Sequence, residues 1–283
     1  MSTTSRRDFL TRSATALGAS FAPSALRRAL GGAASAPGHI PLGVQSYTLR
    51  DFPVEKAIQT SKDLGFEHIE FFGSHFPTNS SAEKIEAMKS KMAGMGMRIS
   101  AHGVNGFGKD HEANRRLFDF AHKAGIKNLS ADPSEDSFDS LDKLVAEFDI
   151  RIAIHNHGPG ARYDKIADVL KAIKGHDPRI GACADLGHYI RSGEDPIKAI
   201  TLLEGRLYGI HLKDFAEPKK DAQGVILGKG HLDVVGVYRA LKKVNFPLDG
   251  ALSLEYEEHP SNPVADVTEC IAIAREAEAK ALA

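Results

Sequence analysis

Residues 151–157 read Arg-Ile-Ala-Ile-His-Asn-His, and residues 180–188 read Ile-Gly-Ala-Cys-Ala-Asp-Leu-Gly-His. Each stretch begins as a short apolar run and ends in imidazole or carboxylate groups. A segment of helical periodicity, residues 163–173, lies between them. Strand, helix and strand in this order favour a parallel βαβ unit, in which both strand ends reach the same edge of the sheet. The two stretches therefore predict a parallel sheet with reactive side chains along its carboxyl edge.

The same unit recurs along the chain. Apolar runs predict eight strands, at residues 42–47, 68–72, 98–104, 127–131, 151–157, 180–188, 207–215 and 251–256. Segments of helical period alternate with them, at residues 54–64, 82–95, 111–124, 137–148, 163–173, 196–203, 232–244 and 264–281. The chain has 283 residues, and the 247 that follow residue 36 match the ~250 of a (β/α)8 TIM barrel. We therefore expect an α/β protein with a single TIM barrel. The alternative is an open doubly wound sheet, although no predicted strand precedes a glycine-rich dinucleotide fingerprint.

The first 36 residues differ from the rest of the chain. Ser5-Arg6-Arg7-Asp8-Phe9-Leu10 is similar to a twin-arginine export signal, with paired arginines ahead of a weakly apolar run. We expect residues 1–36 to form a signal peptide and residues 37–283 to form the barrel. The protein would then be periplasmic or otherwise exported, with the twin-arginine machinery as a partner. The alternative is a disordered basic tail.

Composition excludes several classes of protein. The chain carries 36 Lys+Arg against 37 Asp+Glu, and five arginines against Asp8 give the first 36 residues a net +4, so the remainder carries −5. A mildly acidic domain is a poor candidate for nonspecific nucleic-acid binding. The sequence has no run of 18 uncharged apolar residues that would insert stably into a membrane. Two cysteines are too few for a disulfide scaffold, and we expect Cys183 and Cys270 to be buried thiols.

Imidazole and carboxylate groups gather at the predicted strand ends. Six strands end in such groups, namely Glu70, His102, His155 with His157, Asp185 with His188, His211 with Lys213, and Glu255 with Glu257. Parallel barrel strands bring these ends to one rim. Alternation lets His155 with His157, His211 with Lys213, and Glu255 with Glu257 each face the barrel interior. Several unpaired carboxylates on one rim are costly, and a divalent cation removes that cost. Two imidazoles with two carboxylates suit Mn²⁺, Co²⁺, Fe²⁺ or Zn²⁺ better than Mg²⁺.

The longest connection between predicted elements is residues 216–231, after the seventh strand. It contains three glycines that permit close backbone approach to a ligand, Gly224, Gly228 and Gly230. Loops of this length in a compact domain are often functional. In a TIM barrel this loop would lie over the mouth where active sites form. The alternative is an ordinary surface loop.

Several motifs resemble one known family. Residues 44–51 (Val-Gln-Ser-Tyr-Thr-Leu-Arg-Asp) resemble the opening strand of the sugar-phosphate isomerase/epimerase family with a xylose isomerase-like barrel, and residues 65–70 resemble its second strand. Further similar motifs are Asp185-Leu-Gly-His188, His211-Leu-Lys-Asp214, Gly228-Lys-Gly230 with Asp233, and Leu254-Glu255. The likeness spans about residues 40–275. It implies one divalent metal on the residues that end strands five to eight, which are His155, Asp185, His211 and Glu255.

One position departs from the family pattern. Ketose 3-epimerases of this family carry Glu at the end of the fifth strand, where it helps to transfer a proton, whereas this chain carries His155. The His-Asn-His triplet at residues 155–157 resembles inosose dehydratase-like proteins and an uncharacterised exported branch. Because a metal-bound imidazole cannot also act as a free base, a two-carboxylate proton relay does not follow from the resemblance.

The resemblance implies a sugar isomerase or epimerase, in which a metal polarises a carbonyl and a base removes the adjacent proton. We expect Glu255 to act as ligand and base, or as a ligand alone. Lys213 would donate to a developing oxyanion or pair with a carboxylate, and His188 would act as an acid or bind the substrate. Expected substrate-binding residues are Glu70, His102, His157, His188 and Glu257, the last also an alternate base. The Gly228 loop lacks a P-loop pattern, which favours an unphosphorylated sugar.

Three alternatives stay open at this stage. A keto-sugar or inosose-type dehydratase would begin with the same proton abstraction and then lose water, whereas an isomerase conserves mass. A noncatalytic sugar-binding domain would retain sugar without turnover. An apurinic endonuclease shares the barrel but needs three zinc ions and a basic face, which the acidic charge of residues 37–283 disfavours. The family resemblance also allows a homo-oligomer.

Overall fold

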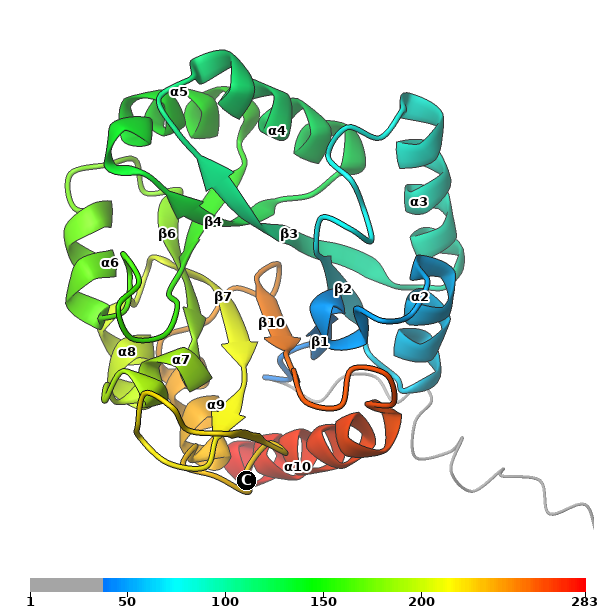
Figure 1. Cartoon of the computed structure of the whole chain (residues 1–283), viewed down its shortest axis with the longest axis vertical. Coiled ribbons are helices and arrows are strands. Elements are labelled where there is room, and N and C mark those ends of the chain that lie inside the picture. Colours follow the sequence, from blue (N-terminus) through cyan, green and yellow to red (C-terminus); the bar gives the residue numbers. More distant parts are fainter. Residues whose placement is uncertain (1–37) are drawn as a thin grey trace, which may run out of the picture. The chain divides into compact units, whose positions relative to one another are not determined.

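Eight parallel strands form a closed barrel in the computed structural model, which describes residues 38–283 (Figure 1). Around the barrel the strands follow the order β1-β10-β7-β6-β5-β4-β3-β2. Every neighbouring pair is parallel, including the β1–β10 pair that closes the ring. The prediction of a (β/α)8 TIM barrel is confirmed.

The elements lie close to their predicted places. The barrel strands are β1 (Gly43–Gln45), β2 (His68–Phe71), β3 (Arg98–Phe107), β4 (Asn128–Pro133), β5 (Arg151–His155), β6 (Ile180–Asp185), β7 (Leu207–Leu212) and β10 (Ala251–Leu254). The helices are α2 (Val54–Asp63), α3 (Ala82–Gly94), α4 (His111–Ala124), α5 (Phe138–Phe148), α6 (Ile166–Ile173), α7 (Leu186–Arg191), α8 (Pro196–Leu202), α9 (Val234–Lys243) and α10 (Val264–Leu282). Two short 3₁₀ helices, η1 (Ser46–Leu49) and η2 (Glu135–Ser137), join them.

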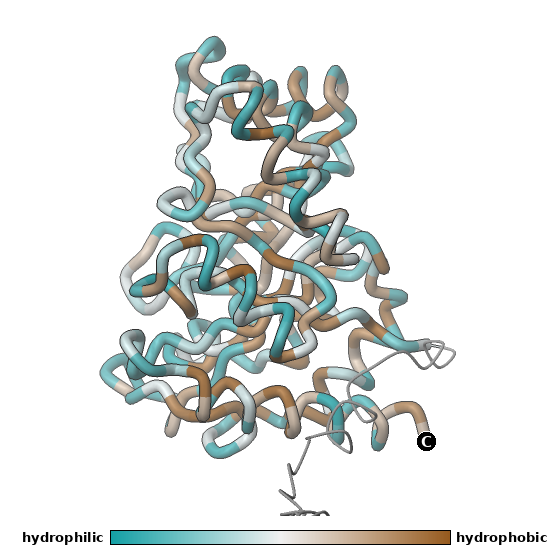
Figure 2. The backbone as a smooth tube through the Cα atoms, turned by 90° about the vertical axis from the view of Figure 1, so that its right-hand side faces the viewer, coloured by the Kyte–Doolittle hydropathy of each residue, from teal (hydrophilic) through white to brown (hydrophobic). Residues whose placement is uncertain are grey.

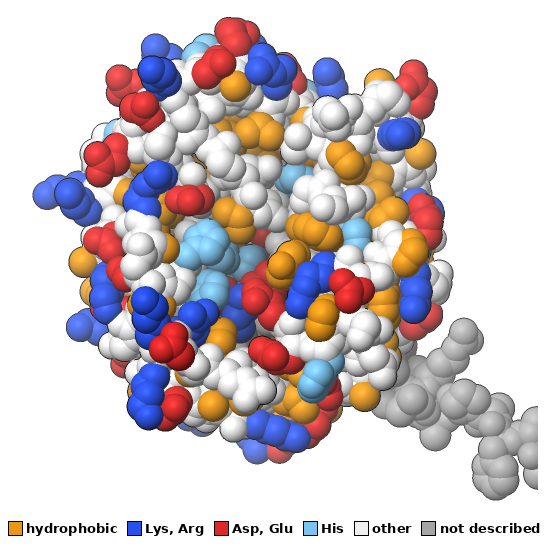
Figure 3. Space-filling view, viewed as in Figure 1, with side chains coloured by type: hydrophobic (Ala, Val, Ile, Leu, Met, Phe, Trp, Pro, Cys, Tyr) orange, Lys and Arg blue, Asp and Glu red, His pale blue; other side chains and the backbone are white. Residues whose placement is uncertain are grey.

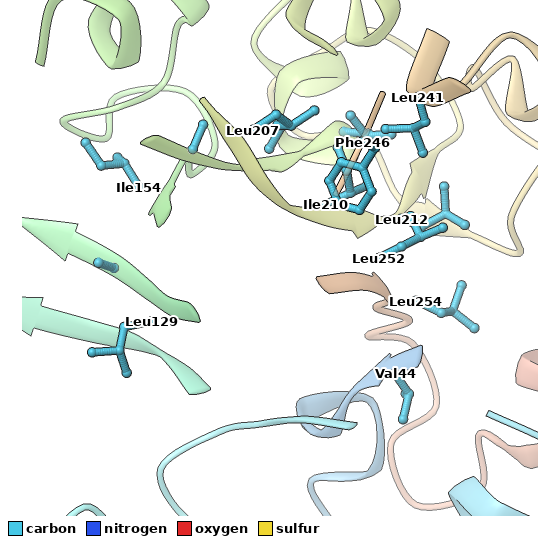
Figure 4. Close-up of a cluster of buried hydrophobic side chains, with 14 of the residues drawn as sticks. Val44, Leu129, Ile154, Leu207, Ile210, Leu212, Leu241, Phe246, Leu252 and Leu254 are labelled. Atoms are coloured by element: carbon cyan, nitrogen blue, oxygen red, sulfur yellow. The ribbon is translucent and has the colours of Figure 1, made fainter. Parts of the chain in front are cut away.

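Alternation along the strands separates two layers of side chains. Ile154, Ile210, Leu212 and Leu254 belong to the buried hydrophobic core, and Figure 4 shows them with residues of α9 such as Leu241. Brown and teal residues alternate along the helices in Figure 2, as expected for helices with one buried face. The residues between these apolar positions are therefore free to point into the barrel.

Two predicted strands, residues 180–188 and 207–215, end three residues early, and these two breaks shape the rim. The stretch 180–188 changes to helix after Asp185, whose Oδ1 accepts the backbone N–H of His188 at 2.7 Å and so caps α7. The stretch 207–215 divides at Lys213. Its last part, β8 (Asp214–Phe215), pairs antiparallel with β9 (Gly224–Val225). Both strands therefore end next to the polar residues of the rim, β6 at Asp185 and β7 just before Lys213.

The long loop is fastened to the rim by one carboxylate. Asp214 accepts four backbone N–H groups at 2.9–3.0 Å, those of the loop residues Gly228, Gly230 and His231 and of Leu232, which follows the loop. Its β9 segment borders a small depression that also contains Glu255 and Glu257. The loop therefore lies on the rim beside the mouth of the barrel. The sequence predicted that it would lie over the mouth, and the structure corrects that prediction.

Other expectations have separate outcomes. Cys183 and Cys270 are both buried and free, as expected. Within residues 38–283, no helix combines the length and apolarity that crossing a bilayer requires. The predicted signal peptide, residues 1–36, lies outside the described residues.

Candidate active site

A cavity of about 360 Å³ opens at the carboxyl ends of the strands. Figure 3 shows the opening with histidines on one side and acidic and basic side chains beside them. Its lining residues are Gln45, Tyr47, Phe72, Gly73, Gly103, Val104, His155, His157, His188, Lys213, Glu255 and Glu257. A cavity at this end of a TIM barrel is the usual position of an active site.

Four buried side chains bring possible metal-ligating atoms together at the base of this cavity. One atom each of His155, Asp185, His211 and Glu255 lies within 4.8 Å of all the others. His211 Nδ1 is 2.9 Å from His155 Nε2, 3.1 Å from Glu255 Oε2 and 3.8 Å from Asp185 Oδ2. These are the four residues that the family resemblance implies as ligands. They come from the ends of β5, β6 and β7 and from the residue after β10.

Lys213 lies against the carboxylates of this cluster. Its Nζ is 3.0 Å from Asp185 Oδ2, 2.6 Å from Glu255 Oε2 and 2.7 Å from Glu257 Oε1. Asp185 Oδ2 is buried and has no well-aligned hydrogen bond, although the lysine is near. One ammonium among three carboxylates leaves the cluster with surplus negative charge, which favours a further cation there.

The charges of the cluster support one another. Burial opposes the ionised form of Asp185, but His188 and Lys213 hold the pKa of that carboxyl well below its usual range. Burial likewise opposes ionisation of Glu255, and the charges of Lys213 and His211 lower the pKa of Glu255 strongly. Burial would lower the pKa of Lys213, whereas Asp185, Glu255 and Glu257 raise it well above its ordinary value. At neutral pH Lys213 is therefore a cation, suited to stabilise an oxyanion rather than to accept a proton.

Two further histidines form the wall beside the cluster. The rings of His157 and His188 are stacked with centroids 5.9 Å apart. Burial lowers the pKa of His188 to about 3 and that of His157 to about 4, so both rings are neutral at pH 7. Both line the cavity, and His188 Nδ1 is buried without a hydrogen-bond partner. The structure thus places both residues where a substrate hydroxyl could meet them.

Two expected substrate-binding residues lie away from the cavity. Glu70 is fully buried beneath His211, with Oε2 3.2 Å from His211 Nε2. His102 donates from Nε2 to the Phe76 carbonyl at 2.9 Å and packs against Phe120 of α4. Neither residue lines the cavity, so the structure does not bring them to the expected substrate-binding position: Glu70 lies behind His211, and His102 lies in the core.

Sequence reasoning missed the opposite wall of the cavity. Tyr47 and Val104 are 38% and 41% exposed although both are large and apolar, and the Tyr47 ring meets Phe72 edge-on at 5.4 Å. Tyr47 and Phe72 end predicted strands, as the histidines do, so the same positional signal could have identified them. It also missed Asn156, which donates to the Asp185 carbonyl and accepts the Asp185 N–H, at 2.9 and 2.8 Å.

The donor set fits a divalent metal. It offers two imidazoles and two carboxylates, a combination suited to Zn²⁺, Mn²⁺, Co²⁺ or Fe²⁺. Asp185 Oδ2, which lacks an aligned hydrogen bond, is one of these donor atoms, and the surplus negative charge lies on the same group of side chains. His155, Asp185, His211 and Glu255 could therefore hold such an ion, while its identity is open to measurement.

Comparison with curated proteins finds relatives among sugar-modifying enzymes. The chain is 23% identical over 208 residues to an inosose dehydratase of Clostridium botulinum, covering 66% of this chain and 67% of that protein. A 3-oxo-isoapionate decarboxylase of Pectobacterium atrosepticum is 22% identical over 180 residues, covering 57% of this chain and 63% of the relative. These reactions are those of the relatives.

Solved structures share the barrel. An uncharacterised protein from Parabacteroides distasonis matches with a TM-score of 0.65 and 29% identity over 84% of this chain and 98% of that one. The IolI protein with a bound zinc atom matches with a TM-score of 0.67 and 15% identity, over 86% and 98%. The E. coli 3-keto-D-glucoside 4-epimerase YcjR matches with 0.66 and 16%, over 84% and 100%. At these last two identities the likeness is one of fold.

A family model described as a xylose isomerase-like TIM barrel matches residues 58–277, which is most of the chain and contains all four clustered donors. Fold, site position and sequence thus agree, and the chain belongs to the xylose isomerase-like TIM barrel family.

Proposed function

We propose that this protein is a divalent-metal-dependent sugar isomerase or epimerase, which removes a proton next to the carbonyl of an unphosphorylated sugar. The observation that carries the proposal is the group of four buried donors at the base of an open cavity, His155, Asp185, His211 and Glu255. A cation held there supplies Lewis acidity to a carbonyl oxygen. Lys213 then offers a second positive charge to the same developing oxyanion.

Glu255 is the proposed base. Its carboxylate lines the cavity, and the low pKa described above keeps it ionised at neutral pH. Glu257 also lines the cavity, has a partly exposed side chain and contacts Lys213, so it could serve as an alternate base. His157 and His188, on a neighbouring part of the wall, would bind hydroxyl groups as neutral imidazoles. Their low pKa makes them poor proton donors at neutral pH, so this binding role replaces the acid role expected for His188.

A dehydratase is the second candidate, and a specific arrangement favours it. The neutral imidazoles of His157 and His188 line the same cavity as the ionised carboxylates, so hydrogen-bonding groups for a departing hydroxyl lie beside a base. His155 stands where the epimerases of the family carry a glutamate, and a curated relative is an inosose dehydratase. The same first step would then end in loss of water.

The test measures metal and chemistry together. The purified chain would be analysed for bound metal and incubated in D₂O with a panel of keto-sugars, aldoses and keto-inositols. The proposal expects about one metal per chain and solvent deuterium at the carbon next to the carbonyl. A product of unchanged mass, apart from deuterium, indicates an isomerase or epimerase, and loss of one water indicates a dehydratase.

A pair of histidine variants makes this test specific. His211→Ala removes a donor at the centre of the cluster and is expected to abolish both metal retention and deuterium incorporation. His122→Ala removes an exposed imidazole on α4 and should change neither. If the wild-type chain retains no metal and His211→Ala binds sugar as well as wild type, the cluster is a polar binding pocket and the enzyme proposal is wrong.

We also propose that residues 1–36 direct export through the twin-arginine pathway. The proposal rests on Ser5-Arg6-Arg7-Asp8-Phe9-Leu10. Replacing Arg6 and Arg7 together by lysine should leave the protein in the cytoplasm of an expression host that exports the unchanged chain. Equal export of both chains would exclude this pathway.

A further inference from the structure

The imidazole of His211 is held from both sides. Its Nδ1 faces His155, Asp185 and Glu255, the other members of the donor cluster. Its Nε2 faces the opposite way and lies 3.2 Å from Oε2 of Glu70. The ring is fully buried. Because an imidazole has two nitrogens with different roles, the group at Nε2 determines what Nδ1 can do.

Glu70 is itself fixed by side chains from three strands. Its Oε1 accepts the Ser130 hydroxyl of β4, and its Oε2 accepts the Ser253 hydroxyl of β10 at 2.8 Å. No water-accessible surface of Glu70 is exposed, and it does not line the cavity. Among the described residues, His211 is the one ion-pair partner of this carboxylate. A buried carboxylate supplied with two hydroxyls and a single imidazole is built to hold that imidazole.

Both nitrogens of His211 face a carboxylate, Nε2 that of Glu70 and Nδ1 that of Glu255 at 3.1 Å. With a cation bound in the donor cluster, Glu255 would direct its charge to the ion, and Glu70 would be the carboxylate left to accept a proton from the ring. The ring would then donate from Nε2 and keep a lone pair on Nδ1. That lone pair is directed at the point where the donor cluster converges. A carboxylate behind a metal-ligating histidine also fixes the ring's rotation and makes the ligand more basic.

We propose that Glu70 is a positioning residue for the metal: it holds His211 in the Nε2–H tautomer so that Nδ1 is the ligating atom. The inference rests on the proposed function, because it assumes that His211 binds a cation. It also accounts for a glutamate buried under the site, where a substrate cannot reach it. The competing explanation is that Glu70 and His211 form a core ion pair that contributes stability alone.

Zinc affinity of the full chain separates the two explanations. Zn²⁺ would be titrated in competition with a chromogenic chelator against wild type and Glu70→Gln, which preserves side-chain shape but not the charge. Loss of an outer carboxylate partner is expected to weaken Zn²⁺ binding by about 10–100-fold. Glu67→Gln is the matched control, because Glu67 contacts His39, 2.9 Å away, outside the site, and its affinity should equal that of wild type.

The outcomes are distinct. If wild type binds no Zn²⁺, the proposed function fails and takes this inference with it. If wild type binds Zn²⁺ and Glu70→Gln binds it equally well, the positioning role is overturned while the proposed function stands. A lower unfolding midpoint in Glu70→Gln with unchanged Zn²⁺ affinity would assign Glu70 to stability alone.

A second measurement needs no variant. In Zn²⁺-loaded wild type with ¹⁵N-labelled histidine, long-range ¹H–¹⁵N correlation spectra report which ring nitrogen of His211 carries the proton. The proposal expects the proton on Nε2 and the shift of a metal-bound nitrogen on Nδ1. A proton on Nδ1 would overturn it, even if Glu70→Gln failed to fold.

Discussion

The two ends of the barrel both contain buried polar side chains, but they use them differently. At the amino-terminal end, four strands begin with a polar residue, His68, Arg98, Asn128 and Arg151. Their donors end on main-chain carbonyls or a carboxylate, those of Pro41, Leu248, Gly250, Ser100 and Asp249. At the carboxyl end, three carboxylates share one ammonium, that of Lys213, and Asp185 Oδ2 lacks an aligned hydrogen bond.

This difference separates stability from function. Polar groups that satisfy main-chain carbonyls join neighbouring strands and stabilise the barrel. Polar groups that converge without satisfying one another cost stability, and such arrangements occur where a ligand supplies the missing partner. We therefore expect substitutions at the two ends to affect different measurements.

The largest expected effect is that of Glu255→Gln at the carboxyl end. The substitution keeps the shape of the side chain but removes a proposed ligand charge and the proposed base. Loss of a general base costs about 10²–10⁴-fold in rate, so deuterium incorporation into the substrate should fall by at least that factor. Zn²⁺ affinity should fall as well. Because Asp185 and Glu257 still pair with Lys213, the unfolding free energy in the presence of a chelator should fall by less than the about 3–5 kcal/mol that breaking a buried ion pair outright costs.

Two results would contradict that expectation. If Glu255→Gln kept its rate and Zn²⁺ affinity, Glu255 would be neither ligand nor base, and Glu257 would become the first candidate. If it unfolded as easily as a core variant, the carboxyl end would carry stability, and the distinction between the two ends would be lost.

Asn128→Ala tests the opposite end. The Asn128 amide donates to the carbonyls of Ser100 and Asp249, both at 2.9 Å. Removing it leaves two carbonyls without that donor, which should lower the unfolding free energy by about 2–3 kcal/mol. Denaturant unfolding would measure this loss. Zn²⁺ affinity and deuterium incorporation should equal those of wild type, and a parallel loss of affinity would show that the two ends are coupled.

His68 should make stability depend on pH. Burial, and then the charge of Arg98, lower the pKa of His68 from 6.5 to about 3. The unfolded chain therefore takes up a proton below pH 6.5 that the folded chain refuses. Its contribution is complete above pH 6.5 and is lost as the pH falls towards 3, with a slope of about 1.4 kcal/mol per pH unit for one proton.

His68→Gln removes that titration. The difference in unfolding free energy between variant and wild type should shift in favour of the variant as the pH falls from 6.5 to 4, measured by denaturant unfolding at each pH. Parallel pH curves would mean that His68 takes up a proton as readily in the folded protein as in the unfolded chain. His157 and His188 titrate in both proteins, so their contributions cancel in the difference.

The sequence predicted the barrel and the polar rim for the same reason. Period-two alternation and a common strand direction determine which residues face inward and which end of the barrel they reach, and both are visible locally. They assigned His155 to the interior and brought six strand ends to one rim, whereas the choice of His155, Asp185, His211 and Glu255 as ligands came from the family resemblance.

Depth and register could not be predicted in this way. Glu70 faces inward as expected, but its depth below His211 depends on how far the strands are shifted around the ring. His102 lies away from the cavity for another reason. The β3 pairing shifts register between His102 and Asn105, and His102 aligns with Leu129 and Phe71 of the core. Such an irregularity changes the inward face and leaves no clear local signal.

Asp214 allows the smallest and sharpest test, because it lies at the carboxyl end but resembles the amino-terminal network. Its two oxygens accept four backbone N–H groups of the loop and of Leu232 after it, at 2.9–3.0 Å. In Asp214→Asn, the side-chain NH₂ is a donor and cannot accept the backbone N–H groups that face it. The loop should therefore loosen, and the unfolding free energy should fall by about 1 kcal/mol. Faster tryptic cleavage at Lys219, Lys220 or Lys229 would report that loosening.

Because no residue of 216–231 lines the cavity, Zn²⁺ affinity should stay at the wild-type value. If it fell as in Glu255→Gln, the loop would be part of the metal site. Residues that matter for function would then be those of the rim and its loops, as opposed to those of the strands. The end of the barrel at which a residue lies would no longer tell whether it serves function or stability.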